Sequence, residues 1–218
     1  MEHTLKALLF DLDGTVLDTR DLILDSFRYA YKKVIDPDTI PPDEKLLALI
    51  GIPLKTQMEM IAPDKSEELF EAYIENNVRV QDEMIKGFAG MEEALQALLD
   101  QGFRLGIVTS KRHEPAQHGL ELMGLDSYFE IILGSDDTSE HKPKPGPLLE
   151  AAEKMGLAIE DCAYVGDSPY DMQSAVSARM FAIGVTWGIF TEQELRDAGA
   201  AVILDDISQL PPLFESAS

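Results

Sequence analysis

The chain of 218 residues is poor in cysteine, in basic residues and in long apolar runs. Its single cysteine, Cys162, excludes an internal disulfide and favours a reducing compartment. No apolar run approaches the ~20 residues that span a bilayer. The first residues lack the basic start and the apolar core of a signal peptide. We therefore expect a cytoplasmic protein with no membrane partner.

Basic residues are few relative to acidic ones: 18 Lys and Arg stand against 40 Asp and Glu, a formal net charge of −22. Such a surface repels phosphate backbones, so we expect no nucleic-acid partner. It also repels anionic substrates unless a metal or a few local cations reverse the field. The hydrophobic share of 45% and the charged share of 27% are typical of a globular protein.

The segment from Lys6 to Thr19 has the strongest pattern in the chain. Its short apolar run, Ala7 to Phe10, ends abruptly in Asp-Leu-Asp-Gly-Thr. A run of this length bounded by turn residues predicts a buried strand of a parallel sheet. Asp11 and Asp13 would then lie at the carboxyl end of the strand, where open α/β sheets bind ligands. Gly14 would let the backbone turn sharply and approach a ligand closely.

Helical spacing of apolar residues follows this strand. It predicts helices over residues 20–34, 43–50, 53–62 and 66–84, with Met58, Met60, Phe70 and Tyr73 in their shared core. About 65 helical residues are long for a βαβ crossover, whose usual minimum is about a dozen. We therefore predict an inserted helical cap at residues 17–86, joined by flexible linkers near 16–20 and 85–90. The core domain would comprise residues 1–16 and 87–218.

From Met91 onward, strands and helices alternate regularly. The predicted strands cover residues 103–108, 128–133, 163–165, 180–185 and 201–204. This alternation predicts an α/β fold with a doubly wound, parallel (Rossmann-like) sheet and right-handed crossovers. Polar residues would gather at the carboxyl ends of the strands. They are Asp11, Asp13, Thr109, Ser110, Lys142 or Lys144, Asp167 and Asp171.

This set of side chains suits phosphate chemistry. Several carboxylates at one edge repel each other unless a cation holds them, and oxygen-only ligands suit Mg²⁺. A lysine adds a point charge for a phosphate or an anionic nucleophile, and the Thr109 hydroxyl can donate to a phosphoryl oxygen. The chain has no GxxxxGK[ST] loop and no Ser-His pairing at a nucleophile elbow. An aspartate is thus the available nucleophile, and the second aspartate of the pair could act as general acid and base.

Four stretches carry a family resemblance. FDLDGTVLDT, IVTSKR, HKPKPGPLLEAAEKMG and YVGDSPYDMQSA resemble, in order and spacing, the four motifs of the haloacid-dehalogenase-like (HAD) hydrolases. The resemblance covers essentially the whole chain. It is closest to the phosphoglycolate phosphatase group, and the helical insertion matches the small α-helical cap of that group. Thr-Ser-Lys, where many phosphoglycolate phosphatases have Thr-Asn-Lys, favours the inorganic pyrophosphatase branch.

The resemblance implies a role for each aspartate of the motifs. Asp11 would be the nucleophile and a metal ligand. Asp13 would be the general acid and base, with its backbone carbonyl on the metal. Asp167 would be the third metal anchor. Asp171 would orient Lys142 or a metal-bound water.

The remaining residues of the motifs are expected to contact the phosphate. Thr109 would bind the transferring phosphoryl group, with Ser110, Lys111 and the Gly14 turn beside it. Lys142 matches the family lysine in its KPxP context and would stabilise the charge on Asp11 and on the phosphate; Lys144 is the alternative.

The function expected from these motifs is a Mg²⁺-dependent phosphatase. It would hydrolyse phosphoglycolate or inorganic pyrophosphate through an aspartyl-phosphate. A β-phosphoglucomutase-like phosphomutase uses the same residues and cap position and stays an alternative. A receiver-like module that accepts a phosphoryl group is a second alternative, although it would be about half this length. A monomer and a homodimer both fit the sequence.

Overall fold

A parallel sheet forms the centre of the larger part of the molecule in the computed structural model, which describes residues 5–215. Its six strands run in the order β5-β4-β1-β6-β7-β8, and all neighbours are parallel. The strands are β1 Ala7–Phe10, β4 Arg104–Val108, β5 Ile131–Leu133, β6 Cys162–Gly166, β7 Phe181–Val185 and β8 Val202–Leu204. The predicted doubly wound α/β fold is confirmed.

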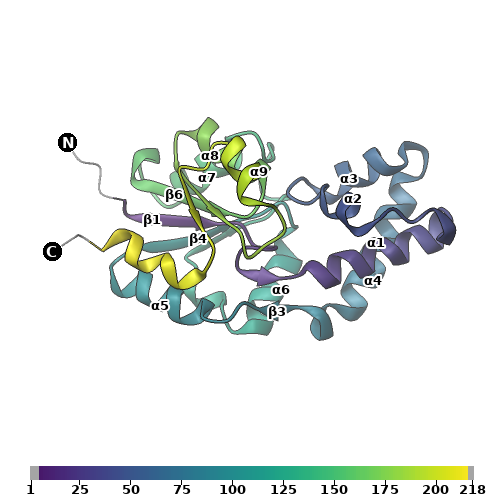
Figure 1. The fold of residues 1–218 in the computed structure, drawn as a ribbon, viewed down its shortest axis with the longest axis horizontal. Coiled ribbons are helices and arrows are strands. Elements are labelled where there is room, and N and C mark those ends of the chain that lie inside the picture. Colours follow the sequence, from purple (N-terminus) through teal and green to yellow (C-terminus); the bar gives the residue numbers. More distant parts are fainter. Residues whose placement is uncertain (1–4, 216–218) are drawn as a thin grey trace.

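Helices cover both faces of this sheet (Figure 1). The side chains of β1 alternate between two apolar layers, as a strand's period of two requires. Leu8 and Phe10 pack against one layer and Ala7 and Leu9 against the other, and all four are fully buried. The first layer holds α5 Met91–Asp100 and α6 His113–Met123, and the second holds α7 Gly146–Lys154, α8 Pro169–Ala178 and α9 Glu192–Asp197.

The position of β1 decides where ligands can bind. The chain passes from β1 to β4 and β5 on one side, and the later strands β6, β7 and β8 extend the sheet on the other side. The strand order therefore reverses beside β1, and open α/β sheets bind ligands in the crevice at the carboxyl ends of such strands. Asp11 immediately follows β1, so the predicted catalytic motif lies at this crevice.

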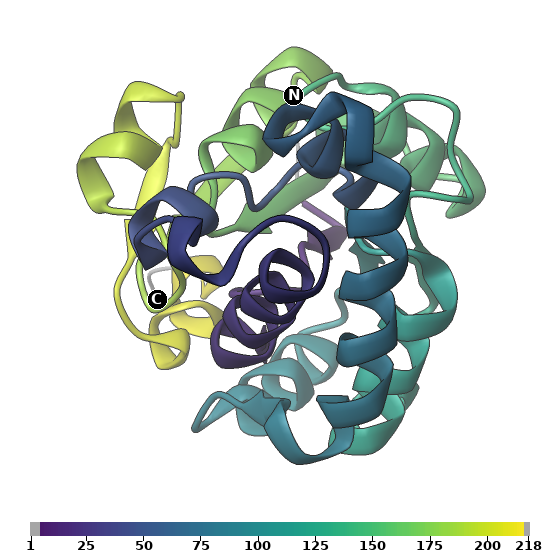
Figure 2. The ribbon, with the colours of Figure 1, turned by 90° about the vertical axis from the view of Figure 1, so that its right-hand side faces the viewer.

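A helical insertion, the cap, lies beyond this end of the sheet (Figure 2). It contains α1 Arg20–Val34, α2 Asp43–Leu47, α3 Leu54–Ile61 and α4 Ser66–Met84. The long helices α1 and α4 pack together around an apolar cluster of their own, in which the rings of Phe27 and Tyr73 meet edge to face at 5.2 Å. No helix within residues 5–215 is both long and apolar enough to cross a membrane.

The methionines of α3 correct one prediction. Met58 is fully buried in the cap core, as expected, but Met60 is 60% exposed, so its assignment to the core is wrong. Two positions apart on an α-helix correspond to a rotation of about 200°. The two methionines therefore face opposite sides of the helix, and only one can point inward.

The two connections between cap and core are paired strands. Leu17–Asp18 (β2) and Lys86–Gly87 (β3) form a short antiparallel ribbon in which Leu17 is opposite Gly87. The sequence predicted flexible linkers at these places, and the pairing ties the two crossing segments to each other. The domain limits at residues 17–86 stay a prediction.

Candidate active site

The turn after β1 positions the first aspartate of the motif. The Asp11 backbone N–H donates to the carbonyl of Val165 in β6 at 2.9 Å, so the sheet pairing extends one residue past the strand. The Asp11 side chain is 5% exposed. Gly14 has a φ of +83°, and a methyl group there would lie 2.3 Å from Asp167 Oδ2. Glycine is therefore required, both for the turn and for the close approach of Asp167.

Lys142 lies buried at the centre of the site. Its Nζ is 2.9 Å from Asp11 Oδ1 and 2.6 Å from Asp171 Oδ1, and it donates to the Tyr164 hydroxyl at 3.0 Å. Burial alone would lower the pKa of Lys142, but the carboxylates of Asp11 and Asp171 raise that pKa well above its usual value. Lys144, the alternative, has a side chain that is 68% exposed and lies 3.6 Å from Glu140. The structure thus places Lys142, the residue preferred from the KPxP pattern, beside the carboxylates at the carboxyl ends of the strands.

Asp171 serves two structural roles at once. The Ser168 hydroxyl donates to Asp171 Oδ2 at 2.6 Å, and the Asp171 backbone N–H donates to the Ser168 hydroxyl at 3.3 Å. This capping box, with Pro169 in the first turn, starts α8. The other oxygen of Asp171 accepts from Lys142. Both oxygens are thus engaged, and the helix start holds Asp171 in position beside the lysine.

Asp167 has one oxygen to spare. Its Oδ2 accepts from the backbone N–H of Ile189 at 2.8 Å, whereas its buried Oδ1 has no hydrogen-bond partner among the residues that the structure describes. Asp167 is fully buried, and burial, followed by the charges of Asp171 and Asp11, raises its pKa well above the usual value. A buried carboxylate oxygen without a donor is the arrangement that a cation would satisfy.

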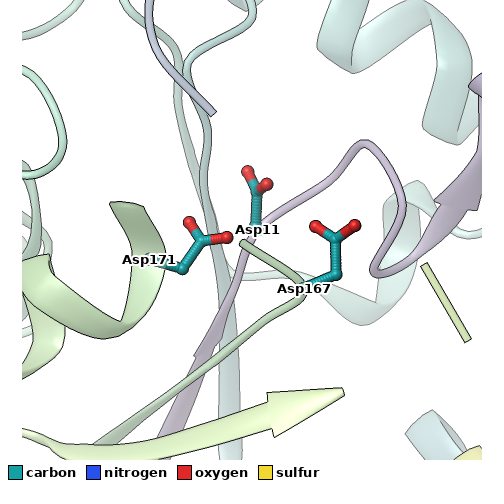
Figure 3. Close-up of side chains that lie close together, drawn as sticks. All are labelled: Asp11, Asp167 and Asp171. Atoms are coloured by element: carbon teal, nitrogen blue, oxygen red, sulfur yellow. The ribbon is translucent and has the colours of Figure 1, made fainter. Parts of the chain in front are cut away.

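Asp11, Asp167 and Asp171 together form a candidate metal site (Figure 3). One oxygen of each lies within 4.8 Å of the others. Burial raises the pKa of Asp11 to about 7, and Lys142 offsets only part of this effect. Three carboxylates against one lysine leave an excess negative charge in a buried place. An oxygen-only donor set of this kind suits Mg²⁺.

Asp13 is held by Lys111. Lys111 Nζ lies 2.9 Å from Asp13 Oδ1, and the two side chains are 12% and 15% exposed. The side chain of Asp13 does not belong to the three-carboxylate group. Thr109 is buried nearby, and its hydroxyl accepts from the Lys111 backbone N–H at 3.2 Å. The segment after β4 therefore brings Thr109 and Lys111 to the carboxyl ends of the strands, where Lys111 contacts Asp13.

Ser110 points to the cap. Its hydroxyl donates to the carbonyl of Gly51 at 2.7 Å, so it lies at the contact between cap and core in this structure. Gly51, with a φ of +104°, packs against the side chains of Ser168 and Tyr170. The phosphate-binding role expected for Ser110 stays a prediction.

A cavity of about 820 Å³ lies between cap and core above these residues. Its core side includes Asp11, Asp13, Thr109, Ser110 and Lys111. Its cap side is formed mainly by the loop before α3, by the first turn of α3 and by one side of α4. Cavities of this size enclose ligands as large as drug molecules. The carboxylates of the β1 motif are thus open to a space that the cap closes.

Sequence reasoning missed two residues that the structure brings to the site. Tyr164 in β6 donates to the carbonyl of Val108 at 2.7 Å and accepts from Lys142, which links two neighbouring strands to the lysine. A buried hydroxyl in the otherwise apolar strand Cys162–Gly166 was the available signal. Gly51 contacts Ser110, Ser168 and Tyr170, and no pattern in the local sequence predicts these contacts.

Fold and site together define a class. The sheet is doubly wound, its switch point holds buried carboxylates around a lysine, and a helical insertion follows the first strand. Proteins of this class are α/β enzymes that bind their ligand at the carboxyl end of the first strand.

Comparison with known proteins identifies the family. The sequence model of the haloacid dehalogenase-like hydrolase family matches residues 8–185. A protein of Caldanaerobacter subterraneus named "Putative pyrophosphatase PpaX" is 36% identical over 204 residues, 94% of this chain and 92% of that protein. Pyrophosphatase PpaX of Halalkalibacterium halodurans is 32% identical over 206 residues, 94% and 95% of the two chains. The solved structure of a predicted phosphatase from Clostridium acetobutylicum, 28% identical, superposes with a TM-score of 0.86 and covers 96% and 98%. The chain belongs to the haloacid dehalogenase-like hydrolase family, as its four motifs predicted.

Proposed function

We propose that the protein is a Mg²⁺-dependent phosphatase that hydrolyses a small phosphate compound through an aspartyl-phosphate on Asp11. The observation that carries the proposal is the buried contact between Asp11 and Lys142 at the switch point of the sheet. A carboxylate that is buried, held by a cation and open to a cavity is suited to act as a nucleophile. The phosphatase and pyrophosphatase names of the relatives support the same reaction class.

The residues at the site fit a divalent cation. Asp11 and Asp167 would hold the metal, because Asp167 Oδ1 is buried with no donor among residues 5–215 and the oxygens of Asp171 are already engaged. The family resemblance adds the backbone carbonyl of Asp13. When bound, Mg²⁺ would neutralise the excess carboxylate charge and draw electrons from the phosphoryl oxygens. Asp171 would act by holding Lys142 in place.

The chain's own residues account for the two half-reactions. In the first, an Asp11 oxygen forms a bond to phosphorus while the bond to the leaving oxygen breaks, and Asp13 gives that oxygen a proton. Thr109 and Lys142 stabilise the charge on the phosphoryl oxygens. In the second, Asp13 takes a proton from water, whose oxygen attacks phosphorus and releases Asp11 and orthophosphate. The cap excludes bulk water during both steps.

The experiment is a measurement of phosphate release from pyrophosphate, 2-phosphoglycolate and β-glucose 1-phosphate, with and without Mg²⁺. Pyrophosphate is in the panel because relatives carry pyrophosphatase names, and 2-phosphoglycolate is in it because the motifs resemble those of phosphoglycolate phosphatases. We expect release that needs both Mg²⁺ and Asp11, so the Asp11→Asn variant is the control. Substantial turnover by that variant would contradict the aspartyl-phosphate mechanism. Isomerisation of the sugar phosphate without net release would identify a mutase instead.

A further inference from the structure

Helix α4 contributes two ridges to the cap wall of the cavity. Phe70, Ile74 and Val78 form an apolar ridge, and Tyr73, Asn77 and Gln81 form a polar one. Within each ridge the residues are four positions apart, and such residues lie one above the other on a helix. One side of α4 therefore offers the cavity apolar surface and uncharged hydrogen-bonding groups next to each other.

The polar ridge is buried and incompletely bonded. The side chains of Tyr73, Asn77 and Gln81 are all buried, and Gln81 Oε1 has no hydrogen-bond partner among residues 5–215. An unpaired buried amide oxygen is costly, so a binding partner that donates to it is favoured. Tyr73 lies close enough to Asp13 for that carboxylate to contribute to the raised pKa of the tyrosine, after the larger effect of burial. The ridge thus extends toward the residue proposed to protonate the leaving group.

Two of the three lysines and arginines that line the cavity within residues 5–215 are paired with carboxylates. Lys111 pairs with Asp13 at 2.9 Å and Arg112 pairs with Asp136 at 3.2 Å. Of the lysines and arginines that line the cavity within residues 5–215, this leaves Lys55, which is exposed. The wall also carries Glu114 and Glu121. A leaving group with its own negative charge would meet repulsion here and little attraction.

Two of the three histidines that line the cavity within residues 5–215 have acidic neighbours as well; the third, His141, is half-buried. His113 Nδ1 lies 2.7 Å from Asp137, and His118 Nε2 lies 2.7 Å from Asp82. The imidazoles of His113 and His118 are therefore engaged with carboxylates of the protein.

We propose that this wall of α4 is a leaving-group subsite, and that the preferred substrate is a phosphomonoester of an uncharged, partly apolar alcohol. The inference rests on the proposed phosphatase function and narrows it. Pyrophosphate and 2-phosphoglycolate both leave behind an anion, and neither uses the apolar ridge. A cavity of about 820 Å³ also has room for a much larger leaving group than either.

The first test compares 2-phenylethyl phosphate with ethyl phosphate, which share the same primary C–O–P linkage and differ by a phenyl ring. With saturating Mg²⁺ we expect kcat/KM for the phenylethyl ester to exceed that for ethyl phosphate and for pyrophosphate by about tenfold or more, since burial of apolar surface favours binding. Equal values for the two esters, or a preference for pyrophosphate, would overturn the proposed subsite while leaving the phosphatase function intact.

Two variants locate the subsite on the molecule. Val78, which lines the cavity, and Met60, which does not, are both apolar cap residues, 59% and 60% exposed. Val78→Asp should lower the phenylethyl-to-ethyl ratio of kcat/KM at least about threefold, because it places a charge on the apolar ridge. Met60→Asp should keep the wild-type ratio. Equal effects of the two changes would show that the ring does not bind along α4.

Binding to the Asp11→Asn variant separates the subsite from the chemistry. Calorimetric titration of this variant with each ester and Mg²⁺ should give a Kd about tenfold lower for the phenylethyl ester. If no compound is hydrolysed by the wild type but this binding preference is found, the proposed function fails and the subsite stands. Equal Kd values would overturn the subsite whatever the turnover.

Discussion

The two walls of the cavity are built on different principles. The core wall is a dense, almost completely buried cluster in which Lys142 lies within hydrogen-bonding distance of Asp11, Asp171 and Tyr164. The cap wall is mostly apolar and uncharged, and one of its buried amide oxygens has no hydrogen-bond partner in the described part of the chain. Rigidly held charges suit bond making and breaking, which require fixed positions. Apolar surface on a separate helical unit suits selection of the leaving group.

The largest difference between core and cap is expected in kcat when an aspartate of each is changed to asparagine. Asp11→Asn is expected to lower kcat by roughly a thousandfold or more, because the nucleophile is lost. Asp43→Asn, on the cap surface beside Arg28, is the matched control and should keep wild-type kcat. Steady-state phosphate release measures both. A comparable loss in the two variants would mean that the core wall does not hold the nucleophile.

The buried lysine should dominate the stability of the core wall. Lys142→Met leaves Asp11 and Asp171 without their cation, and loss of one member of a buried ion pair costs about 3 to 5 kcal/mol of the free energy of unfolding. Lys144→Met removes an exposed lysine that pairs with Glu140, four residues away, at 3.6 Å, and should change that free energy by less than about 0.5 kcal/mol. Urea unfolding at neutral pH compares the two, and similar losses would contradict the assignment of Lys142.

Mg²⁺ should stabilise the core wall by relieving the repulsion between carboxylates. At a free concentration of a hundred times its Kd, the ion should raise the free energy of unfolding by about 2.7 kcal/mol. Removal with a chelator should reverse this gain and abolish turnover. Asp167→Asn should lose most of the Mg²⁺-dependent rise in Tm, which thermal unfolding with and without the ion can detect. An undiminished rise would place the metal elsewhere.

The junction of the two walls can be tested at a glycine. Gly51→Ala would place a methyl 2.7 Å from the Tyr170 ring and 2.8 Å from Ser168 Oγ, with a φ of +104°. We expect backbone strain of about 1 to 2 kcal/mol together with a several-fold rise in KM, because the cap loop can no longer rest on the core. Gly102→Ala is the matched control: at a φ of +90°, with no atom of residues 5–215 within 4 Å, it brings the same backbone strain without a new contact and should keep the wild-type KM.

The smallest effect is expected at the Ser110 hydroxyl. Ser110→Ala removes its hydrogen bond to the Gly51 carbonyl, worth about 1 kcal/mol, so KM should rise roughly fivefold with kcat little changed. This outcome would identify a contact between cap and core. A fall in kcat of about a hundredfold with unchanged KM would instead assign the hydroxyl to the phosphoryl group, as the family resemblance implies.

The sequence by itself determined the fold class, the family and the positions of the motif residues. Asp11, Thr109 and Asp167 each follow a buried strand directly, and parallel strands bring their carboxyl ends to one edge. These placements depend on local patterns of apolar and turn residues, which are legible along the chain. The start of α8 depends on a local pattern of the same kind, since Ser168 and Asp171, three residues apart, form its capping box.

Only the tertiary structure decided which side chains meet. Tyr164 contacts Lys142, Ser110 turns to Gly51, Lys111 pairs with Asp13, and Met60 faces solvent while Met58 is buried. In the first three cases the partners are 22 to 98 positions apart in the chain, so no local pattern couples them. The place of α4 at the cavity wall is another such result, because it depends on how the cap packs over the core. Side-chain partnership is a property of packing in three dimensions, and packing decides it only once the whole chain has folded.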